Sequence, residues 1–220
     1  MNSTTGLYTA AAAGLLLLAG PLGTRAGLWP FLIGFALLGV SFLLALIAIF
    51  VGVVGLIRSQ SPPAAAAAVV AAAVIGLQLR FILPAFGAPP INDITTDLED
   101  PPQLVGAAYD PAFVEQQSRA YPELQPLELA VSMAAAFDRA LAAAEQLGWE
   151  IVERDPTRGH LRAVDTTFWF GFKDDVVVRI RETGNGSRID VRSKSRVGRG
   201  DVGANARRIR AFLAQVREVS

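Results

Sequence analysis

The chain has 220 residues and a formal net charge of zero, but its charged side chains are distributed very unevenly. Residues 1–92 hold three arginines and no acidic residue, whereas residues 93–220 hold 17 basic and 20 acidic residues. This asymmetry indicates two parts that lie in different solvents. The mild negative balance of the second part argues against a nucleic-acid binder, which normally carries a basic excess. The absence of cysteine excludes disulfides and thiolate metal sites.

Three hydrophobic runs in the first part are long enough to cross a bilayer, which takes about 20 apolar residues in a helix. They cover about residues 6–24, 30–57 and 64–86. The third run is rich in alanine and carries Gln78 and Arg80, so its insertion is weaker. A cleaved signal peptide is the competing interpretation of the first run, but no basic region precedes it. We therefore expect a transmembrane region over residues 1–86.

A proline-rich segment follows at residues 87–126, with seven of the thirteen prolines. Proline fixes φ and removes a donor, so we expect an extended, irregular segment that packs on the domain after it. Its carboxylates Asp93, Asp97, Glu99 and Asp100 could in principle bind a cation through oxygen ligands. Solvated spacers are the more common role of such residues, and we expect no metal site.

Residues 127–220 alternate between β-type and helical patterns. Ser132 suits an N-cap and Gly148 a helix C-terminus, and Asn185-Gly186 is typical of a tight hairpin turn. The expected elements are strands at 149–154, 160–168, 175–183 and 187–196, a further short strand near 127, and helices at about 133–147 and 201–217. This order predicts an α+β domain of two layers, with a four- or five-stranded antiparallel sheet and two helices on one face.

The expected hairpin places one apolar and one charged face on the sheet. If Asn185 and Gly186 form the loop, Arg179 lies directly opposite Arg192, which is unfavourable unless something neutralises the pair. In one interpretation, these charges form a solvent-exposed network in which Asp190 neutralises the arginines. The other is an anionic partner, either a lipid head group or an envelope protein, bound to Arg179, Arg192 and Lys194.

A Gly-x-Gly-x-x-Gly motif at residues 198–203 has the spacing of a dinucleotide fingerprint. The context does not fit, because the preceding strand belongs to an antiparallel hairpin and no βαβ unit can close. A tight strand-to-helix connection with Asp201 near the N-cap is the simpler interpretation. Anion binding by the helix start with Arg196, Arg199 and Arg207 stays open. We expect no cofactor.

An aromatic run, Phe168, Trp169, Phe170 and Phe172, closes the second expected strand. Strand alternation would place the three phenylalanines on one face and the tryptophan on the other. These side chains are either core plus a partly covered tryptophan, or a contact with the membrane interface or an apolar ligand.

Three stretches carry a family resemblance: PINDITTD at 90–97, TTFWFGFKDDVVVR at 166–179 and DVRSKSRVGRGDVGANARR at 190–208. They resemble domain-of-unknown-function family 1499, a family of bacterial membrane-associated proteins. The resemblance implies an envelope location in the bacterial inner (plasma) membrane with the soluble domain outside the cytoplasm. It implies no activity. The charges themselves leave the orientation undecided, because Arg25 and Arg58 fall on opposite sides.

The sequence offers few candidate catalytic side chains. His160 is the only histidine, is expected to be exposed, and has no partner cluster; the trio Lys173-Asp174-Asp175 has nothing to position a substrate. We therefore expect a membrane-anchored, non-catalytic module that binds a partner or lipid. The alternative is an enzyme that acts on an envelope lipid or glycan with Asp, Lys, Arg and Ser groups. A pocket in which carboxylates converge would favour the enzyme.

Overall fold

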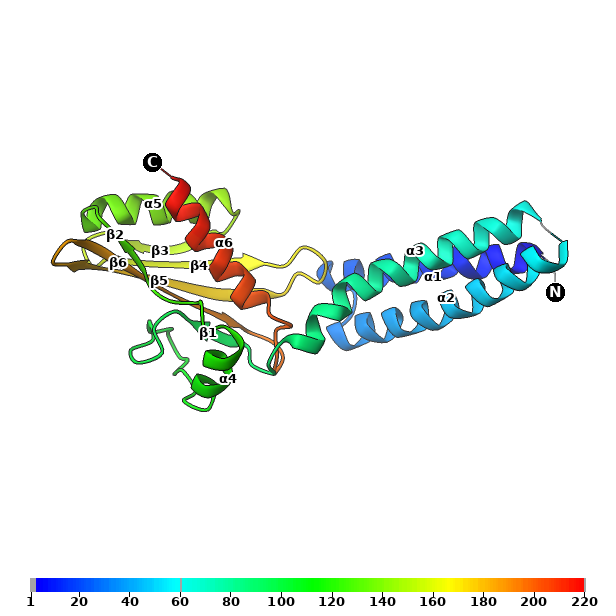
Figure 1. Cartoon of the computed structure of the whole chain (residues 1–220), viewed down its shortest axis with the longest axis horizontal. Helices are drawn as coiled ribbons and strands as arrows, with labels where there is room; N and C mark the ends of the chain where they lie inside the picture. Colours follow the sequence, from blue (N-terminus) through cyan, green and yellow to red (C-terminus); the bar gives the residue numbers. More distant parts are fainter. Residues whose placement is uncertain (1–2, 60, 220) are drawn as a thin grey trace. The chain divides into compact units, whose positions relative to one another are not determined.

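The computed structural model describes residues 3–59 and 61–219, which form two compact units (Figure 1). The helical unit contains the chain up to Phe86 together with Phe168–Gly171. The α+β unit contains Gly87–Thr167 and the chain from Phe172 onward.

Three long helices build the helical unit: α1 (Ser3–Arg25), α2 (Phe31–Ser59) and α3 (Pro62–Ile82). A short 3-10 helix, η1 (Leu83–Gly87), follows α3. Each of the three α-helices is long and apolar enough to cross a membrane. The expected three-helix hydrophobic region is confirmed.

The three helices pack through small residues and through two hydrogen bonds of the buried Ser41. A Cβ added to Gly20 would lie 2.7 Å from the carbonyl oxygen of Gly34, so α1 and α2 approach closely there. The buried Ser41 hydroxyl donates to the Ala13 carbonyl at 2.7 Å and accepts from the Gln78 amide at 3.0 Å. The side chain of Gln78, which weakens the third run as a span, is therefore hydrogen-bonded inside the unit.

The α+β unit is built on an antiparallel sheet with strand order β1-β6-β5-β4-β3, and β2 also pairs with β6. Its elements in chain order are β1 (Asp93–Thr95), α4 (Phe113–Ala120), β2 (Leu127–Leu129), α5 (Met133–Gln146), β3 (Glu150–Asp155), β4 (His160–Thr166), β5 (Lys173–Thr183), β6 (Gly186–Ser195) and α6 (Ala204–Glu218). The predicted α+β class and antiparallel sheet are confirmed. The additional strand is β1, from the proline-rich segment.

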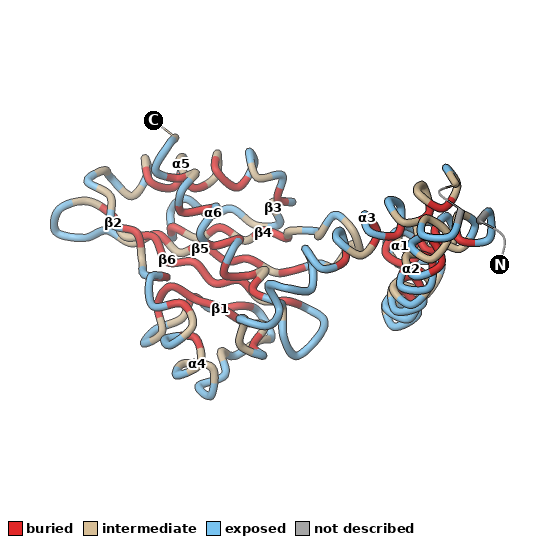
Figure 2. The backbone as a smooth tube through the Cα atoms, turned by 45° about the vertical axis from the view of Figure 1, so that its right-hand side comes forward, coloured by how far each residue is buried: buried red, intermediate tan, exposed pale blue. Residues whose placement is uncertain are grey.

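Helices α5 and α6 lie on one side of the sheet, and α4 lies beside the edge strand β1, where the Gln117 side chain hydrogen-bonds to the Thr95 N–H and carbonyl (Figure 1). The core between the sheet and α5 and α6 is apolar, and the strands appear as mostly buried backbone in Figure 2. Its strand residues include Val176, Val178, Ile180, Ile189 and Val191, all at most 1 % exposed. The prediction of two helices on one face is confirmed, whereas the expectation that residues 87–126 are wholly irregular is wrong, since they contain β1 and α4.

The hairpin of β5 and β6 forms as expected, but its predicted register is wrong by two residues. Thr183 pairs with Gly186, so the loop residues are Gly184 and Asn185. Gly186 has φ +150°, and a Cβ there would lie 2.1 Å from the Leu129 carbonyl oxygen of β2. Both the positive φ and the approach of β2 therefore favour glycine at this position, although it lies outside the two-residue loop.

Candidate functional site

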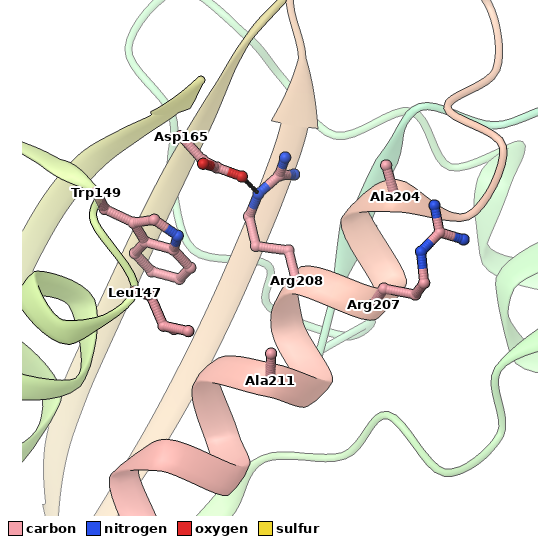
Figure 3. Close-up of a pocket in the computed structure, with 7 residues that line it drawn as sticks. All are labelled: Leu147, Trp149, Asp165, Ala204, Arg207, Arg208 and Ala211. Carbon is pink, nitrogen blue, oxygen red and sulfur yellow. Dashed lines mark hydrogen bonds and ion pairs between the residues drawn. The ribbon is translucent and has the colours of Figure 1, made fainter. Parts of the chain in front are cut away.

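A concave site lies in the α+β unit between the start of α6 and the segment that joins α5 to β3 (Figure 3). We call it the Trp149 pocket. Its volume is about 350 Å³, near the lower end of the range for small-molecule sites. Its lining residues are Leu147, Trp149, Asp165, Ala204, Arg207, Arg208 and Ala211.

Trp149 forms an apolar wall of the pocket because the end of α5 fixes its backbone. Gly148 has φ +76°, which ends the helix in a left-handed conformation, and the Trp149 N–H donates to the Ala144 carbonyl at 3.0 Å. The indole stacks on the Phe212 ring of α6, with centroids 5.0 Å apart and an interplanar angle of 18°. Trp149 is only 7 % exposed, so most of the indole is packed in the core and little of it faces the pocket.

Arg208 forms the polar side of the pocket and reaches four acceptors. Its guanidinium donates to Asp165 Oδ2 at 2.6 Å, Asp174 Oδ2 at 2.6 Å, Asn205 Oδ1 at 2.6 Å and Ser193 Oγ at 3.0 Å. Figure 3 shows the bond to Asp165, which crosses from α6 to β4. Buried ions need this degree of pairing, because an unpaired charge at this depth costs several kcal/mol. The charge of Arg208 is therefore fully engaged within the domain.

Asp165 and Asp174 stand directly opposite each other on β4 and β5. Burial raises the pKa of Asp174 above its ordinary value, and the charge of Arg208 offsets this only in part. Both carboxylates therefore accept a hydrogen bond from the same guanidinium, each through one oxygen. The two negative charges exceed the single positive charge of Arg208, and each carboxylate has a second oxygen that Arg208 does not bind.

Arg207 differs from its neighbour in having no anionic partner. Its side chain is exposed, and its guanidinium donates to the Val202 carbonyl at 2.9 Å. Among the residues the structure describes, no carboxylate oxygen lies within 4.0 Å of this guanidinium. Arg207 therefore lines the pocket on its α6 side, but Figure 3 shows its guanidinium turned away from Trp149.

The charged face of the sheet is covered in large part by the proline-rich segment. Arg179 lies opposite Asp190, and the predicted opposition of Arg179 and Arg192 is wrong because of the register difference. Asp190 accepts from Arg179 at 3.0 Å, and Asp97 accepts from the same guanidinium at 3.1 Å. Burial alone would raise the pKa of Asp97, but the Asp100 backbone N–H and nearby arginine charges outweigh it and hold the pKa below its usual value.

Arg192 is the most buried cation of that face. It is 0 % exposed and forms a two-bond contact with Asp93, at 2.9 and 2.8 Å. Lys194 donates to the same carboxylate at 3.0 Å. The expectation that Asp93 and Asp97 are solvated spacers is wrong, because both are buried and ion-paired. The described part of the chain contains no cluster suited to a metal ion.

The glycine motif before α6 is a tight connection in which Asp201 caps the helix. The Asp201 carboxylate accepts from the Gly203 N–H at 2.8 Å and from the Asn205 N–H at 2.7 Å. These are amides that an anion at the helix start would use. Of the cations predicted near it, Arg196 is paired with Asp175 at 2.7 Å. The helix begins at Ala204, three residues after the predicted start.

The aromatic run does not extend a strand, so the prediction that its side chains alternate across a sheet is wrong. Strand β4 ends at Thr166, and Phe168, Trp169 and Phe170 form a turn. Gly171 has φ +68°, a conformation that glycine adopts without strain. The turn belongs to the helical unit, whereas Phe172 belongs to the α+β unit.

Within the helical unit this turn contacts residues near the helix ends. Arg25 Nη1 donates to the Phe168 carbonyl at 2.6 Å, and its guanidinium lies 5.7 Å from the Phe168 ring centroid. The Phe170 ring lies 4.8 Å from that of Phe35, and the Trp169 ring meets a phenylalanine of α3 edge-on at 6.1 Å. Phe168 itself is 69 % exposed. Its contact with lipid stays a prediction.

The sequence predicted only one residue of the Trp149 pocket, Arg207. The six cations predicted to bind an anion do not converge, since Arg179, Arg192 and Arg196 pair with different carboxylates. The feature of the sequence that could have indicated the pocket is the spacing around Arg208, which follows Asn205 by three residues and precedes Phe212 by four. That spacing places two polar side chains on the row of α6 that buries an aromatic ring.

The structure defines a class of protein: a six-stranded antiparallel α+β domain that follows three apolar helices compatible with membrane anchoring. The chain belongs to the family described as "Protein of unknown function (DUF1499)", whose model matches residues 93–216, more than half of the chain. The family resemblance seen in the sequence is thereby confirmed. No curated protein and no solved structure matches the chain.

Proposed function

We propose that this protein is a non-catalytic binding module of the bacterial envelope, anchored in the plasma membrane with the α+β unit outside the cytoplasm. The anchoring rests on three helices of spanning length, and the envelope location rests on the family resemblance. The bound partner is a small molecule or lipid that enters the Trp149 pocket.

One observation carries the binding role. Asp165 is the only carboxylate among the lining residues, and its Oδ2 accepts from Arg208, so the pocket lacks the pair of free carboxylates that general acid-base work commonly uses. The pocket nevertheless has the concavity, the apolar wall and the few polar groups of a ligand site. Binding without chemistry is the use that this arrangement supports best.

The experiment uses the full-length protein, expressed in a bacterium and extracted in a non-ionic maltoside. Small molecules released on denaturation are identified by mass spectrometry. Ala211→Leu places three more carbons at an exposed lining position of the pocket, and Ala214→Leu makes the same change one turn later, outside the lining. We expect a compound in near-stoichiometric amount from the wild type and from Ala214→Leu, and its loss from Ala211→Leu. Equal recovery from all three proteins would contradict the proposal.

A second candidate function is an enzyme that acts on an envelope lipid or glycan. The cross-strand pair of Asp165 and Asp174, with the raised pKa of Asp174, favours it. Asp174→Asn separates the two functions, since an amide oxygen still accepts from Arg208. A binding module retains the same compound in both proteins. An enzyme would hold product in the wild type and unreacted substrate in Asp174→Asn.

A further inference from the structure

We infer that the loop Phe168–Gly171 lies in the interfacial zone of the bilayer, between the hydrocarbon and the lipid head groups, where Phe168 and Trp169 contact phospholipid. The partner of this surface is the bilayer itself. The inference goes beyond the ligand pocket of the proposed function, and it rests on the membrane anchoring that the proposed function also uses.

The loop connects two strands of the sheet, yet its contacts place it in the helical unit. A closed neck separates it from the strands. The Thr167 N–H donates to the Phe172 carbonyl at 2.8 Å, and the Phe172 N–H donates to the Thr167 hydroxyl at 2.9 Å. Only the four residues beyond this neck belong with the helices, so the chain returns to the helical unit after α3 through a short loop.

The loop packs against all three long helices. It contacts Arg25 in the last turn of α1, Phe35 in the second turn of α2 and Phe81 in the last turn of α3. A Cβ on Gly34 would lie only 3.0 Å from a ring carbon of Phe170, so α2 leaves space for that ring. Because one loop reaches all three helices, these helix ends lie at the same end of the helical unit.

The length of α2 gives the depth of the loop in a membrane. The helix has 29 residues, or about 43 Å at about 1.5 Å per residue, whereas the hydrocarbon core is about 30 Å thick. If α2 is centred in the bilayer, each of its ends extends about 6–7 Å beyond the hydrocarbon. Phe35 lies four residues after Phe31, about 6 Å along the helix. The Phe170 ring that contacts it is therefore at the boundary between hydrocarbon and head groups.

Large apolar side chains are exposed at this end of the helical unit. Phe168 is exposed in the loop, Leu28 in the connection between α1 and α2, and Leu83 and Phe86 after α3. Exposed apolar surface of this extent is uncommon in water and marks a contact with a membrane or another protein. The same unit has three helices of spanning length, so the bilayer is the partner that already surrounds it.

The other side chains at this end suit the interfacial zone. Two of the three tryptophans of the chain, Trp29 and Trp169, lie in the α1–α2 connection and in the loop. Tryptophan is enriched at this depth, because its ring is apolar and its N–H donates a hydrogen bond. Arg25 and Arg80 lie in the last turns of α1 and α3. An arginine near the end of a span keeps its apolar stem in the membrane and its charge among the head groups.

The test uses the full-length protein in nanodiscs of phosphatidylcholine and phosphatidylglycerol. The chain has no cysteine, so a nitroxide can be attached to one introduced cysteine at a time: Phe168→Cys, Leu43→Cys or Glu182→Cys. Leu43 is exposed in the middle of α2, and Glu182 is exposed near the end of β5 that is farther from the loop. Electron paramagnetic resonance measures the collision rate of each label with oxygen, which concentrates in hydrocarbon, and with a nickel chelate, which stays in water.

We expect the ratio of oxygen to nickel collision rates at Phe168→Cys to be several-fold higher than at Glu182→Cys and lower than at Leu43→Cys. A ratio equal to that of Glu182→Cys would overturn the inference, because the loop would then lie in water. Low collision rates with both reagents would also overturn it, because a second copy of the chain would then cover the loop.

The Leu43→Cys label separates this inference from the proposed function. A hydrocarbon ratio at Leu43→Cys with an aqueous ratio at Phe168→Cys would remove the inference alone. An aqueous ratio at Leu43→Cys would remove the anchoring on which both proposals rest.

A second measurement leaves Phe168 unchanged and uses Trp169 as the probe. The fluorescence that the wild type has in excess of Trp169→Phe comes from this residue, since Trp29 and Trp149 are present in both proteins. We expect it to be quenched more strongly by phosphatidylcholine brominated near the carbonyl ends of its acyl chains than by phosphatidylcholine brominated near their methyl ends. No quenching by either lipid, or stronger quenching by the second, would contradict an interfacial position.

Discussion

Replacing Arg192 by alanine tests whether the proline-rich segment is fixed to the sheet by a buried ion pair. Arg192 and Asp93 are both 0 % exposed and share two hydrogen bonds. The substitution leaves Asp93 with only Lys194 as its ion-pair partner and removes the donor that reaches the Pro102 and Ala107 carbonyls. Removing one partner of a buried pair costs about 3–5 kcal/mol, because the other charge stays buried. We expect the free energy of unfolding of the α+β unit to fall by that amount.

The assay is equilibrium unfolding of the full-length protein by urea in a non-ionic detergent, followed by near-ultraviolet circular dichroism. Arg181→Ala is the matched control on the same face: its side chain is 41 % exposed, and the carboxylates it contacts keep Arg179 and Arg188. Exposed ion pairs contribute about 0–1 kcal/mol, so this variant should lose little stability. Equal losses from the two variants, or a loss below about 1 kcal/mol from Arg192→Ala, would refute the reasoning.

Three further predictions use the same assay. Asp201→Ala removes the acceptor of the Gly203 and Asn205 N–H groups and should lower the free energy of unfolding by about 0.5–2 kcal/mol. A more stable variant would argue against the role of Asp201 as a helix cap. Gly159 has φ +60°, with a Cβ position 2.1 Å from a β5 carbonyl oxygen, so Gly159→Ala should cost at least about 1–3 kcal/mol. The lowered pKa of Asp97 means that its charge stabilises the fold above about pH 4. The difference in unfolding free energy between wild type and Asp97→Asn should shrink as the pH falls through that pKa, and a constant difference would count against this role.

Much of the fold follows from local chemistry that a sequence displays. The Ser132 hydroxyl accepts from the Ala135 N–H at 3.3 Å, as its place before an amphipathic run predicts. Gly148 takes the left-handed conformation that ends the same helix. The apolar alternation of Val176, Val178 and Ile180 was enough to assign the core face of β5.

The hairpin register could not be predicted, because the alternation of apolar and polar side chains is unchanged by a register shift of two residues. A slide of one residue would move every side chain to the other face, whereas a slide of two leaves the faces intact. The Asn185-Gly186 pair favours a loop at those residues. The carbonyl of Leu129, which comes from a strand 57 positions earlier than Gly186, is what places the glycine in β6.

The pocket and the buried ion pairs could not be predicted because they join residues that are far apart in the chain. Asp93 reaches Arg192 across 99 positions, and Asp165 reaches Arg208 across 43. Composition indicated solvated carboxylates in the proline-rich segment. The topology instead brings that segment alongside β6, where Asp93 meets a buried arginine.

The most direct test of the anchored, outward-facing arrangement is thiol labelling, because the chain has no cysteine of its own. Single cysteines are placed at Leu43 in α2 and at Glu182 near the hairpin loop, both exposed in the structure. A membrane-impermeant maleimide is then added to intact spheroplasts. The proposal predicts rapid labelling of Glu182→Cys and none of Leu43→Cys, which lies in hydrocarbon. Labelling of Leu43→Cys at the same rate, or protection of Glu182→Cys until the membrane is opened, would contradict it.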